Sequence, residues 1–300
     1  MLKIAYHPIY NHPLPKGHRF PMEKYELLPQ QLIHEGTCAT INFFRPTKPN
    51  DKHILSVHDP NYYYDLVNIT LDQRAARKIG FPLSEVLVER EVVIADGTMK
   101  ASEYAITYGI AMNIAGGTHH AYTNRGEAFC LLNDQAIGAR YLQQKSLAKN
   151  ILIVDLDVHQ GNGTAEIFAN DKSVFTFSMH GKSNYPFKKE ISDLDIALED
   201  NTTDDLYLNI LKDTLPKLID SHQPDFIYYL CGVDIIESDK LGKLALTLDG
   251  CKERDRFVLQ TCKDLRIPVM CSMGGGYSSD IKIIVEAHAN TFRLAQDIFF

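Results

Sequence analysis

The chain has 300 residues, of which 45% are hydrophobic and 23% charged, and its formal net charge is −7. This composition is ordinary for a folded globular protein and excludes disordered, collagen-like and coiled-coil chains. The negative charge argues against a protein held on nucleic acid by phosphate contacts, because such proteins usually present a clustered basic surface. We therefore expect no direct nucleic-acid binding.

No apolar run approaches the roughly 18 residues of a membrane span, and the first residues lack the apolar core of a signal peptide. The six cysteines are scattered without a Cys-x-x-Cys pair, so we expect free thiols in a cytoplasmic protein. No repeat or Gly/Ser linker divides the chain, and residues 45–52 predict a surface loop. One domain over residues 1–300 is the expectation.

Short apolar runs alternate with helical patterns along most of the chain. The predicted strands cover residues 3–6, 110–114, 151–155, 174–178, 226–230 and 269–272, and the predicted helices cover 133–144, 203–221 and 283–298. This alternation predicts an α/β fold with a mostly parallel sheet covered on both faces, a three-layer α/β/α arrangement. Ligands of such sheets bind at the carboxyl ends of the strands.

Polar motifs follow several of the predicted strands. The first is Gly116-Gly117-Thr118-His119-His120, which continues to Phe129-Cys130 and Asn133-Asp134. Adjacent histidines suit proton transfer beside a metal, because histidine titrates near neutral pH. A histidine pair alone is more often a surface or packing feature.

The second motif follows the strand 151–155 and contains Asp155, Asp157, His159 and Gly161-Asn162-Gly163. In extended geometry the first three side chains lie on one face. Aspartate oxygen and histidine nitrogen are ordinary zinc ligands, and an unpaired buried carboxylate is strongly disfavoured. A capped strand end with hydrogen-bonded acids is the alternative interpretation.

Two further motifs follow later strands. Residues 231–239, Cys-Gly-Val-Asp-Ile-Ile-Glu-Ser-Asp, include acids of which one is able to complete a three-ligand metal site. Gly274-Gly275-Gly276-Tyr277 lets the chain pass close to a substrate and offers a phenol hydroxyl to a developing oxyanion. Neither motif is specific by itself.

Together these motifs resemble the zinc-dependent histone deacetylase and acetylpolyamine amidohydrolase family, whose fold is related to arginase. The matching pieces are Gly-Gly-Thr-His-His-Ala, Phe-Cys-x-x-Asn-Asp, Asp-x-Asp-x-His-x-Gly-Asn-Gly, Gly-x-Asp-x-x-x-x-Asp and Gly-Gly-Gly-Tyr, in the family's order. Residues 159–163 and 237–242 look most like class IV histone deacetylases, and Asn162 departs from the class I pattern.

The resemblance implies that Asp157, His159 and Asp239 bind Zn²⁺, with Fe²⁺ as an alternative metal. It also implies that Asp155 pairs with His119 and that Asn162 orients His120. The implied substrate contacts are Gly117, Phe129, Tyr185 and Gly275, with Arg19 near the inner end of the site. A structural K⁺ would be held by backbone carbonyls around Asp155, Asp157, His159, Ser178 and Met179.

The implied reaction is hydrolysis of the amide bond of an Nε-acyl-lysine in a protein or peptide. His120 would move the proton, His119 would support the site, and Tyr277 would stabilise the oxyanion. The resemblance to class IV leaves long fatty acyl groups open as well as acetyl. Three alternatives remain: an acetylpolyamine or other small-molecule deacetylase, an arginase-type enzyme with two manganese ions, and a non-catalytic module that recognises acyl-lysine.

Overall fold

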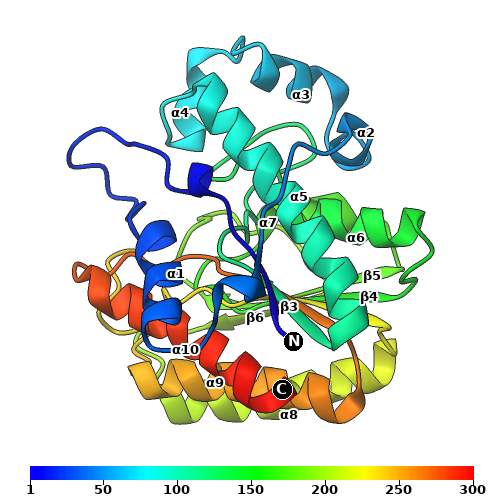
Figure 1. Cartoon of the computed structure of the whole chain (residues 1–300), viewed down its shortest axis with the longest axis vertical. Helices are drawn as coiled ribbons and strands as arrows, with labels where there is room; N and C mark the ends of the chain where they lie inside the picture. The colour runs from blue at the N-terminus through cyan, green and yellow to red at the C-terminus, as the bar shows by residue number, and fades with distance from the viewer.

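The computed structural model describes all 300 residues and has one sheet of eight parallel strands at its centre (Figure 1). The strand order is β2-β1-β3-β8-β7-β4-β5-β6. The strands are β1 (Lys3–Ala5), β2 (Phe43–Phe44), β3 (Ile110–Asn113), β4 (Ile151–Asp155), β5 (Val174–Gly181), β6 (Leu194–Leu198), β7 (Phe226–Leu230) and β8 (Val269–Ser272). The predicted α/β class and parallel sheet are confirmed.

Helices cover both faces of this sheet (Figure 1). One layer contains α1 (Lys24–His34), α8 (Asp204–His222), α9 (Leu248–Leu265) and α10 (Ile281–Phe299), and the other contains α5 (Glu85–Tyr108) and α6 (Asp134–Gln144). The remaining helices are α2 (Asp51–Ile54), α3 (Pro60–Val67), α4 (Gln73–Ile79), α7 (Asn162–Phe168) and two 3₁₀ turns, Pro8–Tyr10 and Thr40–Asn42. The predicted three-layer arrangement is therefore present.

The inner strands β3, β4, β7 and β8 are buried along their whole length. Strands covered on both faces are expected to be continuously apolar, which explains why these four were found from the sequence. The edge strands β2 and β6 were not predicted, because β2 has two residues and β6 carries Asp195 and is largely half-buried.

The longest helix, α5, was also absent from the predicted elements. Its buried side chains occur all round the helix, and Gly97 lies in its middle. A helix that is buried on most sides shows little hydrophobic periodicity, so its sequence carries a weak helical signal. No helix combines the length and the hydrophobicity of a membrane span. All six cysteines are free, as predicted, and all six are buried.

A buried ion pair on α9 holds the loops that follow two central strands. Arg254 and Asp255 are both fully buried, and the guanidinium donates to the carbonyl oxygens of Leu156, after β4, and Gly232, after β7. The Asp255 carboxylate also accepts the hydroxyl protons of Tyr229 and Thr291, at 2.5 and 2.6 Å. This pair therefore ties α9 to the two loops in which polar motifs were found.

Replacing Asp255 with alanine should destabilise the protein strongly, because it leaves the Arg254 charge buried without its partner. We expect a loss of about 3–5 kcal/mol in the free energy of unfolding. Glu253→Ala is the matched control, since the Glu253–Arg256 pair lies on the same helix but is about half exposed, and should cost less than about 0.5 kcal/mol. Urea denaturation followed by circular dichroism measures both; equal losses would contradict the role of the buried pair.

Candidate active site

Four loops meet at the carboxyl ends of β3, β8, β7 and β4, which are neighbours in the sheet. They line a small buried cavity of about 40 Å³. The cavity lining includes most of the residues singled out in the sequence: Gly117, His119, His120, Phe129, Asp157, His159, Gly275 and Tyr277. Parallel strands bring the motifs to one edge, as expected for an open α/β sheet.

Asp157, His159 and Asp234 form a buried cluster whose ligand atoms lie within 4.8 Å of one another. His159 Nδ1 is 3.0 Å from Asp157 Oδ1 and 3.2 Å from Asp234 Oδ2. Asp157 and His159 come from the loop after β4, and Asp234 comes from the loop after β7. One imidazole nitrogen and two carboxylates are the donor set of a mixed N/O site that suits Zn²⁺ or Fe²⁺.

The cluster has the electrostatics of a cation site. Asp234 Oδ2 is buried and receives no hydrogen bond. Burial and the neighbouring Asp157 raise the pKa of Asp234 to about 7. Burial alone would lower the pKa of His159, but its contacts with the two aspartates outweigh that effect and raise the pKa to about 10. Two buried carboxylates are thus stabilised by positive charge between them, so these residues fit a divalent metal.

The backbone around the cluster leaves no room for side chains. A Cβ atom on Gly275 would lie 2.0 Å from Asp234 Oδ2 and 2.8 Å from Asp157 Oδ2. The amide of Gly275 instead donates to Asp157 Oδ2 at 2.9 Å. The glycine run therefore serves to bring the backbone against the carboxylates.

The prediction of Asp239 as the third metal ligand is wrong in this structure. Its Oδ1 accepts the amide protons of Leu241 and Gly242, both at 2.8 Å, and its Oδ2 accepts that of Tyr277 at 2.6 Å. Asp239 thus ties the loop after β7 to the loop after β8. Asp234, the first acid after β7, takes its place in the cluster. The sequence signal that could have identified Asp234 is the motif Gly232-Val233-Asp234, which follows the buried strand β7.

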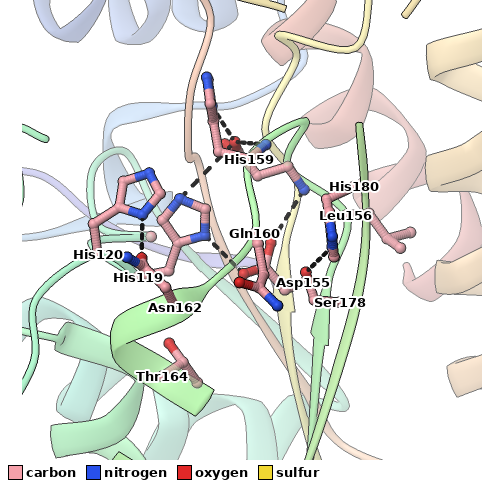
Figure 2. Close-up of polar contacts among 12 residues, drawn as sticks. His119, His120, Asp155, Leu156, His159, Gln160, Asn162, Thr164, Ser178 and His180 are labelled. Carbon is pink, nitrogen blue, oxygen red and sulfur yellow. Dashed lines mark hydrogen bonds and ion pairs between the residues drawn. The ribbon is translucent and has the colours of Figure 1, made fainter. Parts of the chain in front are cut away.

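Each histidine of the pair is held by a different partner, as Figure 2 shows. His119 Nδ1 lies 2.7 Å from Asp155 Oδ2, and His120 Nδ1 lies 2.6 Å from Asn162 Oδ1. The two ring centroids are 4.1 Å apart. These are the pairings that the family resemblance implied. Both use Nδ1, so neither Asp155 nor Asn162 occupies the Nε2 atom of its histidine.

The partners give the two imidazoles opposite pKa shifts. Burial would lower the pKa of His119, but the charge of Asp155 outweighs burial and raises it. Burial lowers the pKa of His120 well below its usual value, and the nearby His119 and His159 lower it further. Asn162 is neutral: its Oδ1 accepts a hydrogen bond from His120 Nδ1 but adds no negative charge that would raise the pKa of the imidazole as a carboxylate does. His120 is therefore neutral and able to accept a proton.

Asp134 positions the histidine loop, a role the sequence did not reveal. Its Oδ1 accepts the amide protons of Gly117 and Thr118 at 2.8 and 2.9 Å, and its Oδ2 accepts the hydroxyls of Thr98 and Ser272. Gly117 has a positive φ of 76°, which favours glycine. The carboxylate thus fixes the turn from which His119 and His120 project.

Aromatic rings form the wall between the cavity and the surface. The ring of Phe129 lies 5.2 Å from that of Phe20 and 6.1 Å from that of Tyr277. Phe129 has a φ of 70°, and its amide donates to the carbonyl oxygen of Ile79 at the end of α4. A non-glycine residue held in this region usually marks a position fixed by its surroundings, here a wall of the site.

Tyr185 lies at the outer part of the site, where its ring is 4.9 Å from that of His120 and its hydroxyl donates to Glu127. Arg19 also lines this outer cavity, the mouth of the site, with its guanidinium 5.0 Å from the Phe129 ring centroid. The expectation that Arg19 lies near the inner end is therefore wrong. Arg90 lines the inner cavity, and fully buried Lys24 donates to the Gly274 carbonyl at 3.0 Å.

A family model described as the histone deacetylase domain matches residues 18–292. The chain belongs to the histone deacetylase family. An uncharacterized protein of Picosynechococcus sp. is 44% identical over 296 residues, which cover 99% of both chains. Histone deacetylase 2 of Arabidopsis thaliana is 29% identical over 290 residues, which cover 93% of this chain and 74% of the relative.

Solved structures agree on the fold. A crystal structure of an HDAC homolog complexed with SAHA has a TM-score of 0.86 at 22% identity and covers 99% of this chain and 84% of its own. The HDA15 HD domain has a TM-score of 0.79 at 18% identity and covers 98% of this chain and 90% of its own. The chain is thus a histone deacetylase-family hydrolase of the deacetylase fold.

Proposed function

We propose that the protein hydrolyses the amide bond of Nε-acyl-lysine in proteins or peptides and depends on Zn²⁺. The observation that carries this proposal is that the His119–His120 pair, Tyr277, and Asp157 and His159 of the metal-ligand cluster line one small cavity, with Asp234 completing the cluster behind them. A bound zinc ion supplies a Lewis acid that polarises the acyl carbonyl and activates water. The other steps belong to side chains of this chain.

His120 is the proposed general base, since it lines the cavity, is neutral and is oriented by Asn162. It takes the proton of the attacking water and returns it to the departing lysine amine. His119, paired with Asp155, supplies positive charge beside the reacting atoms. Tyr277 donates its hydroxyl to the oxyanion, and Gly117, Phe129 and Gly275 enclose the acyl chain.

The charge of the mouth disfavours an acetylpolyamine substrate. Arg19, Lys78 and Lys243 line the mouth, and no carboxylate does. A polyamine carries further ammonium groups, which these side chains repel, above all Arg19, since Lys78 and Lys243 are near Glu127 and Asp200. The arginase-type alternative needs additional bridging carboxylates, whereas the metal-ligand cluster here consists of Asp157, His159 and Asp234.

Two finer proposals follow from the family resemblance. Similarity to class IV around Asn162 makes long acyl groups candidates beside acetyl. The second is a potassium ion bound by backbone carbonyls around Asp155 and Ser178, which are neighbours in the ladder between β4 and β5.

The test is hydrolysis of one peptide that carries acetyl-, octanoyl- or myristoyl-lysine, with release of free lysine measured by mass spectrometry. We expect turnover of at least one peptide, loss of this activity after chelation, and recovery of the activity when Zn²⁺ is added back. Adding Fe²⁺ to a second chelated sample shows which of the two metals restores more activity. Peptide binding that is insensitive to chelation, without release of lysine, would instead support the non-catalytic module. Turnover of acetylpolyamines alone would support the small-molecule alternative.

Replacing Asn162 with aspartate should change the pH dependence of the reaction. A carboxylate beside His120 Nδ1 raises the pKa of the imidazole by about one unit or more. Because the base acts in its neutral form, the acidic limb of the kcat/KM profile should move to higher pH by the same amount. Asn201→Asp, at an exposed position, is the control and should leave the limb in place. An unmoved limb in Asn162→Asp would contradict the assignment of His120 as base.

A further inference from the structure

We propose that the mouth of the site selects acyl-lysines whose neighbouring residues are acidic, and that Arg19 is the main selectivity residue. This inference rests on the proposed function and names its substrate class. The mouth is a cavity of about 450 Å³ that reaches from the surface to His120, His159 and Tyr277. A lysine side chain that enters the site must pass through it.

The mouth is positively charged, although the chain as a whole carries a net charge of −7. Its lining of 13 residues contains Arg19, Lys78 and Lys243 but no aspartate or glutamate. These three side chains come from the loop before α1, from α4 and from the loop after β7. Segments far apart in the sequence therefore place like charges around one opening.

The three cations differ in how far they are already neutralised. Lys78 is 3.5 Å from Glu127, and Lys243 is 3.8 Å from Asp200, and both lysine side chains are about half exposed. Arg19 is exposed and has no ion-pair or hydrogen-bond partner; its guanidinium stacks on Phe129 instead. An exposed guanidinium fixed on an aromatic wall is free to bind an incoming carboxylate in a bidentate manner.

The geometry of an extended peptide brings its neighbouring residues within reach of these charges. When the acyl-lysine side chain lies in the channel, the peptide backbone stays at the mouth. Residues one to three positions away then lie within about 10 Å, since an extended chain rises about 3.3 Å per residue. This distance is comparable to the screening length of roughly 8 Å at physiological salt. Acidic neighbours are attracted and basic neighbours repelled.

The test uses three peptides that differ only in the residues flanking one acetyl-lysine: acidic, neutral or basic. We expect kcat/KM of the zinc enzyme to fall in that order, about tenfold from the acidic to the basic peptide, and the difference to shrink in high salt. Binding of the same peptides, measured by fluorescence anisotropy, should follow the same order. Equal kcat/KM values, or a preference for basic flanks, would overturn the inference while leaving the proposed function in place.

Charge-reversal variants assign the effect to the mouth. Arg19→Glu should reduce the ratio of acidic to basic kcat/KM by about fivefold to tenfold, whereas Arg19→Lys should retain most of it. Lys16→Glu is the matched control, since it makes the same charge change in the same loop but does not line the mouth. A ratio reduced equally by Lys16→Glu would show a general charge effect and overturn the role of Arg19. If no peptide is hydrolysed, the proposed function fails, and the anisotropy order alone decides the inference.

Discussion

Asp234→Asn should lose its metal while keeping its fold. The asparagine carbonyl still accepts the Val158 amide proton that Asp234 Oδ1 accepts at 2.9 Å, so the loop after β4 keeps its support. The charged oxygen that faces His159 is replaced, and zinc affinity should fall by more than about 100-fold, since even indirect partners of ligands contribute 10–100-fold. Metal content measured after dialysis, together with hydrolysis of an acetyl-lysine peptide, tests this expectation.

The metal-free form of this variant should be at least as stable as the metal-free wild type. The raised pKa of Asp234 means that ionising this carboxyl costs free energy in the native state; the cost grows as the pH rises above the usual pKa of 3.8 and is complete above about pH 7. Asparagine removes that unfavourable charge, so the melting temperature at pH 8 without metal should stay equal or rise. A large fall would mean that Asp234 serves chiefly to stabilise the fold.

Asp239→Asn is the matched control for the ligand assignment. Both variants remove one carboxylate from the loop after β7, but Asp239 contacts backbone amides and lies outside the metal cluster. We therefore expect full metal content in Asp239→Asn, with slower turnover because the Tyr277 amide loses part of its anchor. Metal loss in Asp239→Asn with retention in Asp234→Asn would reverse the assignment.

Tyr277→Phe should reduce kcat by about 10² to 10³ with little change in KM. The variant removes one donor to the oxyanion, a contact that contributes this much in comparable sites. The phenyl ring keeps its position against Phe20 and Phe129, and the backbone amide still donates to Asp239, so the fold and the metal site should be unaffected. Steady-state kinetics and metal analysis on one preparation measure both properties.

Wild-type turnover by Tyr277→Phe would exclude the tyrosine as the oxyanion donor. Tyr25→Phe is a useful comparison, because Tyr25 also lines the inner cavity but packs beside Arg90 rather than at the mouth. Its kcat should change much less than that of Tyr277→Phe. A similar loss in both variants would indicate a general effect of removing polar groups from the cavity.

The sheet and the histidine partners could both be predicted from the sequence, but for different reasons. Strands such as β4 and β7 are apolar throughout because both faces are buried, and that pattern is visible in any short window. The pairs His119–Asp155 and His120–Asn162 followed from a family resemblance carried by motifs that retain their order. The edge strand β6 and the helix α5 lacked such a signal.

The sequence alone determined the α/β class, the parallel sheet and the set of loops that contribute to the site. Only the tertiary structure decided that Asp234 rather than Asp239 faces His159, that Arg19 lies at the mouth, and that Asp134 and Lys24 support the site. Strand and helix patterns are properties of neighbouring residues. Which of two acids five positions apart reaches a metal depends instead on how the loop after β7 folds against those after β4 and β8, and those contacts join residues far apart in the chain.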